Sequence, residues 1–236
     1  MSELVLSLFP GIGLLDMAFE EAGFCIVRGP DLLWGGQVKT FHPPAGKFAG
    51  IIGGPPCQVH SQASEIVGSA KEDLIPEFVR VVDEAKPEWI VMENVPQAIE
   101  STAIPEAWSV TKLRDWDVGG FTSRIRCFWS WPFMLLVPPR AHGDPQHSVM
   151  ASTYKRGKST SQYCADKGFL PGDLPIKEYA RLQGADVIGE ALERHKSSRA
   201  FAVHVLGNGV PLAMGRAIAA AVKNALEATC DSGISA

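Results

Sequence analysis

The sequence predicts an α/β fold in which helices cover both faces of a mostly parallel β-sheet. Short apolar runs, which are typical of buried strands, alternate with segments whose apolar residues recur at helical spacing. Several of these runs end in glycine, proline or a polar residue. Alternating strands and helices favour a parallel sheet, because each helix carries the chain back to the start of the next strand. The 236 residues leave room for one such domain and a small additional lobe.

The first part of the chain predicts a strand, a glycine turn, a helix and a second strand. Residues 4–9 form the first apolar run, and the turn Pro10-Gly11-Ile12-Gly13 follows it. Apolar residues then recur at helical spacing as far as Gly23, which is placed to end the helix. Residues 24–27 predict the second strand, and residues 50–54 predict the third.

The remaining elements are a helix up to Lys86, a strand over residues 89–92 and a further strand over 126–131. Residues 134–175 show no sustained period and predict either an irregular small lobe or a mobile loop. Helical spacing returns over residues 176–182. It returns again after Pro211, which stands where a closing helix would begin.

Composition limits the class of protein. The start of the chain has neither a basic leader nor a long apolar core, so we expect no signal peptide, and no run approaches the length of a membrane span. The five cysteines are scattered without a C-x-x-C pair, which favours a reducing, cytoplasmic protein without structural zinc. A net charge of −4 weighs mildly against a protein that coats nucleic acid without specificity.

The segment Gly53-Gly54-Pro55-Pro56-Cys57-Gln58 carries the strongest chemical signal. Two glycines and two prolines impose an unusual backbone path and then present a cysteine at the end of a strand. A structural cysteine needs only an apolar hole, whereas a nucleophilic thiol needs a fixed direction and surroundings that stabilise its thiolate. We therefore predict that Cys57 is a nucleophile.

The turn after the first strand predicts a cofactor site. Its glycines let a ligand approach the backbone at a helix amino terminus, and Asp31 follows about 20 residues later, where an acid commonly binds a ribose. Asp16 stands where the dinucleotide fingerprint has its third glycine, which favours a nucleoside cofactor without a pyrophosphate. A simple tight turn is the alternative.

Two further segments lie at predicted strand ends. Glu93-Asn94-Val95 places an acid after an apolar strand, where a carboxylate is costly unless it is paired or used. Arg124-Ile125-Arg126 places two guanidinium groups on one face of a strand, suited to a carbonyl or a phosphate. Taken alone, a loop acid and a pair of solvated arginines would look the same.

Taken in order, these segments resemble the cytosine carbon-5 DNA methyltransferases of the small bacterial or phage type. The motifs that carry the resemblance are Phe-x-Gly-x-Gly, Gly-Pro-Pro-Cys-Gln, Glu-Asn-Val, Arg-x-Arg, Arg181-Leu182-Gln183-Gly184 and Gly207-Asn208-Gly209-Val210-Pro211. The match covers roughly 4–23, 50–133 and 176–223. It implies a Rossmann-like S-adenosylmethionine-dependent methyltransferase fold with a small irregular target-recognition lobe.

The resemblance also implies roles for single residues. Cys57 would attack carbon 6 of a flipped-out cytosine, and Glu93 would hold or protonate ring nitrogen 3. Arg126 would contact the carbonyl oxygen of the base, supported by Arg124. The expected S-adenosyl-L-methionine site consists of Phe9, Gly11, Ile12, Gly13, Asp31, Pro56 and Asn208. The residues expected to contact double-stranded DNA are Gln58, Ser61, Arg140, Lys155, Arg156 and Lys158.

Some positions depart from the family pattern. Pro30 and Asp31 stand where an acid and an aromatic residue are usual, so the ribose role falls to Asp31, and adenine recognition is unassigned, with Trp34 and Phe48 as candidates. His60 replaces a usual phenylalanine. Thr122 replaces a usual glutamine, which we expect to weaken the support of the arginine strand.

The expected organisation is a catalytic and cofactor-binding domain over 1–133, a target-recognition segment over 134–175, a return to the catalytic domain over 176–228 and a disordered tail over 229–236. Because 134–175 is short, we expect a target of no more than about four base pairs. We expect a monomer with no metal. The alternatives are the same chemistry on tRNA, a catalytically silent family member that binds DNA or a partner, and a nicotinamide dehydrogenase.

Overall fold

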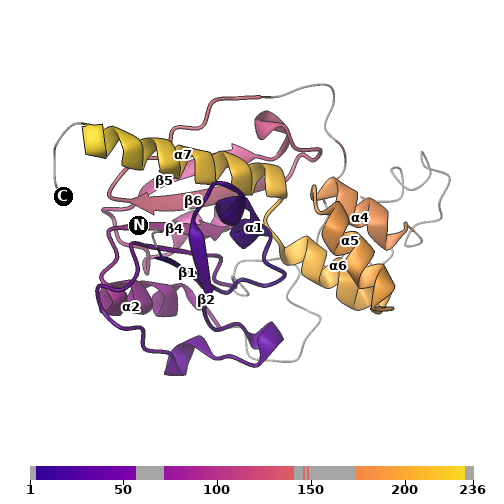
Figure 1. The fold of residues 1–236 in the computed structure, drawn as a ribbon, viewed down its shortest axis with the longest axis horizontal. Helices are drawn as coiled ribbons and strands as arrows, with labels where there is room; N and C mark the ends of the chain where they lie inside the picture. The colour runs from indigo at the N-terminus through magenta and orange to yellow at the C-terminus, as the bar shows by residue number, and fades with distance from the viewer. Residues whose placement is uncertain (1–3, 57–71, 141–145, 147, 149–173, 232–236) are drawn as a thin grey trace.

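A computed structural model describes residues 4–56, 72–140, 146, 148 and 174–231 of the chain. Its centre is a six-stranded sheet with the strand order β2-β1-β3-β4-β6-β5 (Figure 1). The strands are β1 (Leu4–Leu8), β2 (Cys25–Arg28), β3 (Gly50–Gly53), β4 (Trp89–Asn94), β5 (Ser109–Arg114) and β6 (Ile125–Trp131). The sheet is mostly parallel, which confirms the predicted fold class.

Strand direction determines which ends of the strands meet. β1 pairs in parallel with β2 and β3, and β3 pairs in parallel with β4. β6 runs antiparallel to both β4 and β5. The start of β6 and the end of β5 therefore lie at the same edge of the sheet as the carboxyl ends of β1 to β4. Ligands bind at this edge in open α/β sheets.

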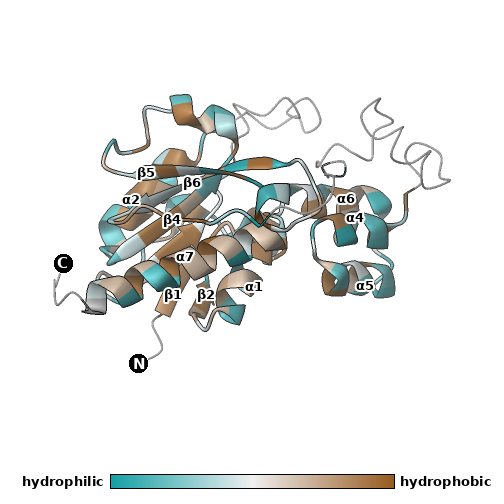
Figure 2. Ribbon diagram, turned by 90° about the horizontal axis from the view of Figure 1, so that it is seen from above, coloured by the Kyte–Doolittle hydropathy of each residue, from teal (hydrophilic) through white to brown (hydrophobic). Residues whose placement is uncertain are grey.

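The sheet separates two apolar cores. Val5, Ile52 and Val91 point to one face, where they pack with residues of α1 (Leu14–Glu21) and α7 (Leu212–Asp231). Their neighbours along the strands point to the opposite face and pack with α2 (Ile75–Ala85). This alternation follows from the period of two in a β-strand. Figure 2 shows that the strands are mostly apolar, and in Figure 1 β4 and β6 lie between α7 and α2.

Local sequence explains where the helices begin and end. Gly13 has a left-handed backbone, with φ of 79°, at the residue before α1, and Gly23 has φ of 98° just after it. Lys86 ends α2 in the left-handed region. α7 begins directly after Pro211, as predicted, and continues to Asp231, three residues beyond the boundary expected at 228.

Three helices form a separate small lobe. They are α4 (Ile176–Leu182), α5 (Asp186–Arg194) and α6 (Arg199–Asn208), which lie together at one end of the molecule beside the sheet (Figure 1). Their apolar cluster includes Tyr179, Val203 and Leu206, and Leu14 of α1 joins it. The lobe is thereby held against the helix that follows the glycine turn. Of the three helices, only α4 was predicted.

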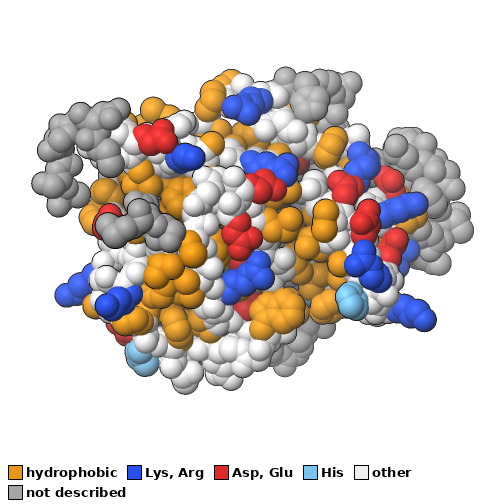
Figure 3. Space-filling model, in the orientation of Figure 1, with side chains coloured by type: hydrophobic (Ala, Val, Ile, Leu, Met, Phe, Trp, Pro, Cys, Tyr) orange, Lys and Arg blue, Asp and Glu red, His pale blue; other side chains and the backbone are white. Residues whose placement is uncertain are grey.

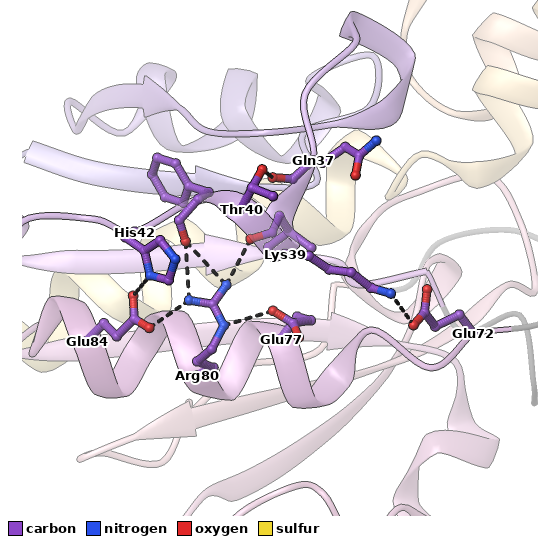
Figure 4. Close-up of polar contacts among 10 residues, drawn as sticks. Gln37, Lys39, Thr40, His42, Glu72, Glu77, Arg80 and Glu84 are labelled. Atoms are coloured by element: carbon purple, nitrogen blue, oxygen red, sulfur yellow. Dashed lines mark hydrogen bonds and ion pairs between the residues drawn. The ribbon is translucent and has the colours of Figure 1, made fainter.

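A charged cluster on α2 holds the chain between β2 and β3. Arg80 donates to the backbone carbonyls of Val38 and Phe41, and it forms ion pairs with Glu77 and Glu84 (Figure 4). The two carbonyls belong to the short 3₁₀ helix η2 (Val38–Thr40) and to the residue just after it. Because one guanidinium group binds both, this segment is held against α2 although it forms no strand.

One stretch, Arg199–Thr229, is long and apolar enough to cross a membrane by length and composition alone. It consists of α6 and most of α7, with Gly209 and Pro211 between the two helices. Within the structure 67% of its most apolar window is buried. We therefore interpret it as part of the protein core.

Candidate active site

Glu93 lies at the carboxyl end of β4 and is almost fully buried, with 8% of its surface exposed. Gly54, just after β3, faces it: a Cβ atom at Gly54 would lie 2.7 Å from Oε2 of Glu93. The glycine therefore leaves the space that the carboxylate occupies. Because β3 and β4 are parallel neighbours, the ends of the two strands bring these motifs together.

Asn94 ties the proline segment to the same strand end. Its Nδ2 donates to the carbonyl oxygen of Pro55 over 3.1 Å, and its Oδ1 accepts from the backbone N–H of Val95. Pro55 is buried and Pro56 is half-buried. The backbone that leads into Cys57 is thus anchored beside Glu93. Cys57 itself, with Gln58, His60 and Ser61, lies outside the described residues.

Arg126 contacts the carboxylate of Glu93. Its Nε lies 2.7 Å from Oε1 of Glu93, and its Nη1 donates to the carbonyl oxygen of Ile125. The two side chains meet because β6 is antiparallel to β4, with Glu93 opposite Phe128 in the register. Arg126 enters the site two residues earlier on the reversed strand, beyond the point where the pairing with β4 ends.

Arg124 lies at the same edge but has a different partner. It is buried, and its Nη2 donates to the carbonyl oxygen of Gly207 over 2.6 Å. Gly207 lies near the end of α6, so this contact links the sheet edge to the helical lobe. The two arginines thus lie close together, one directed to Glu93 and the other to the Gly-Asn-Gly segment.

Burial and charge act in opposite directions on these groups. Burial raises the pKa of Glu93 above its ordinary value of 4.5, and the nearby charges of Arg126 and Arg124 oppose that rise only in part. Burial, with repulsion from Arg126, lowers the pKa of Arg124 to about 9, so this guanidinium stays charged at neutral pH. A carboxyl that holds its proton more tightly than usual is suited to donate it.

The glycine turn carries a second group of residues. The carboxylate of Asp31 accepts hydrogen bonds from the backbone N–H groups of Gly11 and Leu33, over 2.8 and 2.7 Å. Trp34 donates from its indole N–H to the carbonyl oxygen of Gly11, and 70% of its surface is exposed. A Cβ atom at Gly11 would meet nothing within 4 Å, so open space lies over the turn. Phe48 packs into the core on the α2 side and is less suited to line this space.

The turn rests on an ion pair between a buried carboxylate and a largely exposed arginine. Asp16 in the first turn of α1 is fully buried, accepts a hydrogen bond from the hydroxyl of Ser7 and pairs with Nε of Arg28 over 2.8 Å. A Cβ atom at Gly13 would lie 3.1 Å from the guanidinium of Arg28. Asp16, which replaces the third glycine of the dinucleotide fingerprint, therefore has a role in holding the turn.

Asn208 is exposed at the end of α6 and forms a hydrogen bond with Nε2 of His204 over 3.2 Å. The next residue, Gly209, approaches α1 closely, since a Cβ atom there would lie 2.8 Å from Cδ1 of Leu14. The Gly-Asn-Gly segment therefore lies beside the beginning of α1. Phe9 and Ile12, on the turn before α1, are half-buried.

Arg140 is the one predicted DNA contact within the described part of the chain. Its side chain is exposed, and its backbone N–H donates to the carbonyl oxygen of Asp117. Lys155, Arg156 and Lys158 lie outside the described residues. On the face drawn in Figure 3, acidic and basic side chains lie interspersed. Among the described residues, no group of three or more His, Cys, Asp or Glu side chains could hold a metal ion.

Thr122, a departure from the family pattern, contacts Asp115, which no motif in the sequence indicates. Thr122 is fully buried, and both its backbone N–H and its hydroxyl donate to Oδ2 of Asp115 over 2.8 Å. The sequence predicts weaker support of the arginine strand at Thr122. In the structure, Thr122 is bound by Asp115 in the turn that leads into that strand. Asp115 directly follows β5, as Glu93 lies at the end of β4, but the sequence does not predict β5 and therefore gives no signal for Asp115.

Fold and site together define an α/β protein with a cofactor-type glycine turn and a buried carboxylate beside a Pro-Pro-Cys segment. Residues 36–113 match the model of the C-5 cytosine-specific DNA methylase family. The Type II methyltransferase M.HgiGI of Herpetosiphon aurantiacus is 32% identical over 120 residues, which cover 39% of this chain and 90% of that relative. The chain belongs to this family.

Other comparisons agree with this assignment. M.MthTI, a Type II methyltransferase of Methanothermobacter thermautotrophicus, is 34% identical over 121 residues, covering 43% of this chain and 36% of that relative. The match thus spans only about a third of the length of M.MthTI, and likewise about a third of the Type II methyltransferases M.NgoPII and M.FnuDI. A prophage-encoded E. coli protein named as a DNA modification methyltransferase shares the fold, with a TM-score of 0.64 at 17% identity over 96% of this chain and 100% of that chain.

Proposed function

We propose that the protein transfers a methyl group from S-adenosylmethionine to carbon 5 of cytosine in DNA, through a covalent bond between Cys57 and carbon 6. The observation that carries the proposal is the position of Glu93. Its buried carboxyl lies against Gly54, three residues before Cys57, and contacts Arg126. One edge of the sheet thus holds a proton donor, a guanidinium group and the backbone that leads to the thiol.

The carboxyl of Glu93 prepares the pyrimidine ring. Burial raises its pKa, which keeps a proton available for ring nitrogen 3 of a flipped-out cytosine. A protonated nitrogen withdraws electrons from carbon 6. The thiolate of Cys57 can then form a bond to that carbon, and the electron pair displaced by this bond makes carbon 5 nucleophilic.

The two arginines have separate tasks in this proposal. Arg126 lies beside Glu93 and 15% of its side chain remains exposed, so its remaining donors can contact the carbonyl oxygen of the base. Arg124 is directed away to Gly207 and supports Arg126 from behind. After methylation, loss of the proton from carbon 5 and release of the Cys57 sulfur restore the aromatic ring and the free enzyme.

The described residues fit an adenosine-type cofactor, which supplies the methyl group when it is bound. Open space over Gly11, the Asp31 carboxylate and the exposed indole of Trp34 lie next to one another. Each oxygen of Asp31 accepts one backbone hydrogen bond and retains a lone pair for a ribose hydroxyl. Trp34 offers an apolar face for the adenine, and Phe9, Ile12, Gly13, Pro56 and Asn208 complete the proposed site.

DNA is the proposed substrate, because the matching family model describes DNA methylases and the matching relatives are named Type II methyltransferases. Residues 134–175, with Arg140, Lys155, Arg156 and Lys158, are proposed to contact it together with Gln58 and Ser61. A segment of this length offers few side chains to base edges. We therefore propose a target of about four base pairs or fewer.

Nucleoside mass spectrometry of DNA and tRNA tests the proposal. Cells that express the protein should contain 5-methylcytosine in DNA, and cells that express Cys57→Ser should lack it. Cys25→Ser is the matched control, because Cys25 is exposed on β2 and should leave methylation unchanged. Methylation confined to tRNA would make tRNA the substrate, and methylation in neither pool would favour a silent binding protein.

A further inference from the structure

The turn that connects β5 to β6 is built around a buried carboxylate. Asp115 directly follows β5 and is 1% exposed. Its Oδ2 accepts hydrogen bonds from both the backbone N–H and the hydroxyl of Thr122. The turn brings the chain back over ten residues to the two arginines of the proposed active site.

The backbone of Asp115 is also part of this arrangement. Its N–H donates to the carbonyl oxygen of Arg124 over 2.9 Å, and its carbonyl oxygen accepts from the N–H of Gly120 over 2.8 Å. A Cβ atom at Gly120 would collide with the carboxylate of Asp115, so glycine is required there. Side chain and backbone of one residue thus contact three points of the same turn.

We infer that Asp115 is a positioning residue for the proposed methyl transfer. Its carboxylate holds the turn so that Arg124 reaches Gly207 and Arg126 enters β6 facing Glu93. The expected effect of Asp115 on the rate of methyl transfer rests on the proposed function. The expected effect of Asp115 on the position of Arg124 does not. Asp115 itself lies behind the arginines and is not assigned a contact with substrate.

Charge supports this role. Arg124 is buried, with 5% of its surface exposed; the charge of Arg126 repels it, and both Glu93 and Asp115 attract it. Burial raises the pKa of Asp115 too, but the hydrogen bonds from Thr122 and the charge of Arg124 oppose that rise and favour the ionised form. Asp115 can therefore balance Arg124 when Glu93 takes up a proton. A buried cation without a compensating charge is strongly unfavourable. Asp115 therefore allows Glu93 to become neutral while Arg124 keeps its charge and its contact with Gly207.

A purely structural turn would not need the charge. An asparagine could accept a hydrogen bond from Thr122 with nearly the same shape, so Asp115→Asn separates charge from shape. Asp117→Asn is the matched control: Asp117 lies in the 3₁₀ helix η4 (Trp116–Val118), which directly follows Asp115, and is partly exposed. Thr122→Val removes the hydrogen bond from the hydroxyl to Asp115 and the longer one, over 3.4 Å, that the hydroxyl accepts from the backbone N–H of Arg124, and it leaves the Asp115 charge in place.

The kinetic experiment measures methyl transfer to DNA at saturating and at limiting cofactor. Asp115→Asn should lower kcat on the order of tenfold, with KM for S-adenosylmethionine changed by less than about twofold, because the arginine edge is displaced and the glycine turn is not. Thr122→Val should lower kcat less, and Asp117→Asn should match the wild type. Equal kcat for Asp115→Asn and wild type would overturn the inference.

A second measurement does not depend on activity. In ¹⁵N-arginine spectra, the Nε–H of Arg124 should exchange slowly with solvent in the wild type and at least tenfold faster in Asp115→Asn. Faster exchange in a protein that methylates nothing would reject the proposed function and retain the positioning role. Unchanged exchange would reject the positioning role. If Asp115→Asn does not fold, Thr122→Val decides by the same exchange measurement, with faster exchange expected.

Discussion

The carboxylate of Glu93 and the guanidinium of Arg126 lie 2.7 Å apart at the edge where β6 runs past β4 in the opposite direction. Neither residue reaches this position alone. Glu93 depends on the absence of a side chain at Gly54, and Arg126 depends on the turn that Asp115 and Thr122 hold. The proposed chemistry therefore depends on the Glu93–Arg126 contact, on the space left at Gly54 and on the turn between β5 and β6.

Glu93→Gln tests the role of the carboxyl. The amide keeps the shape and can still accept from Arg126, but it cannot deliver a proton to the base. We expect kcat to fall by about a hundredfold or more, within the range for loss of a general acid. Methyl transfer to DNA measures this, with Glu100→Gln as control, because Glu100 is exposed after β4. A kcat within threefold of wild type would contradict the role.

The same variant predicts a pH effect on stability. Burial raises the pKa of Glu93 above 4.5, so the folded protein binds this proton more tightly than the unfolded chain. The free energy of unfolding should therefore decrease as pH rises from the ordinary carboxyl range through the raised pKa. Glu93→Gln lacks this term, so its stability relative to wild type should increase with pH. Thermal melts at pH 5 and pH 8 measure the difference, and an opposite trend would mean that the pKa is lowered.

Two adjacent glycines should respond differently to alanine. At Gly53 a Cβ atom would lie 2.3 Å from the backbone oxygen of Leu8, which cannot move without disturbing the sheet. Gly53→Ala should lower the free energy of unfolding by about 2–3 kcal/mol. Gly54→Ala meets the carboxylate of Glu93 instead, which can shift, so activity should fall more than stability. Urea unfolding and methyl transfer, measured on both variants, distinguish the two effects.

Trp34→Ala tests the proposed adenine contact. Loss of an exposed aromatic face beside the glycine turn should weaken S-adenosylmethionine binding about tenfold, equivalent to about 1.4 kcal/mol. Calorimetric titration measures the change. Val187→Ala is the control: Val187 has a similar exposed fraction, 69%, but lies on α5 in the helical lobe. Equal affinity of Trp34→Ala and wild type would remove Trp34 from the site.

Several elements could be predicted because their signals are local. The strand runs before Gly11 and Gly54, the amphipathic pattern of α2 and the proline before α7 depend on short segments alone. α6 was missed because its apolar residues Ala202, Val203, Val205 and Leu206 do not form one clear face. β5 was missed because it is an edge strand in which only Leu113 is buried.

The relations within the site could be predicted only in part. Glu93 and Arg126 were each identifiable, but their contact depends on the antiparallel direction of β6, which the strand pattern does not contain. The divergent directions of Arg124 and Arg126 depend on the helical lobe, which supplies Gly207 as a partner. Asp115 carries no motif, and its role becomes visible only from the folded turn.

The central claim is that the sulfur of Cys57 bonds to a cytosine ring. The most direct measurement is intact mass spectrometry after incubation with S-adenosylmethionine and duplex DNA in which 5-fluorocytosine replaces the target base. We predict a stable protein–DNA adduct that maps to the peptide containing Cys57 and is lost in Cys57→Ser. Absence of an adduct with DNA that the enzyme methylates, or an adduct that persists in Cys57→Ser, would contradict the account.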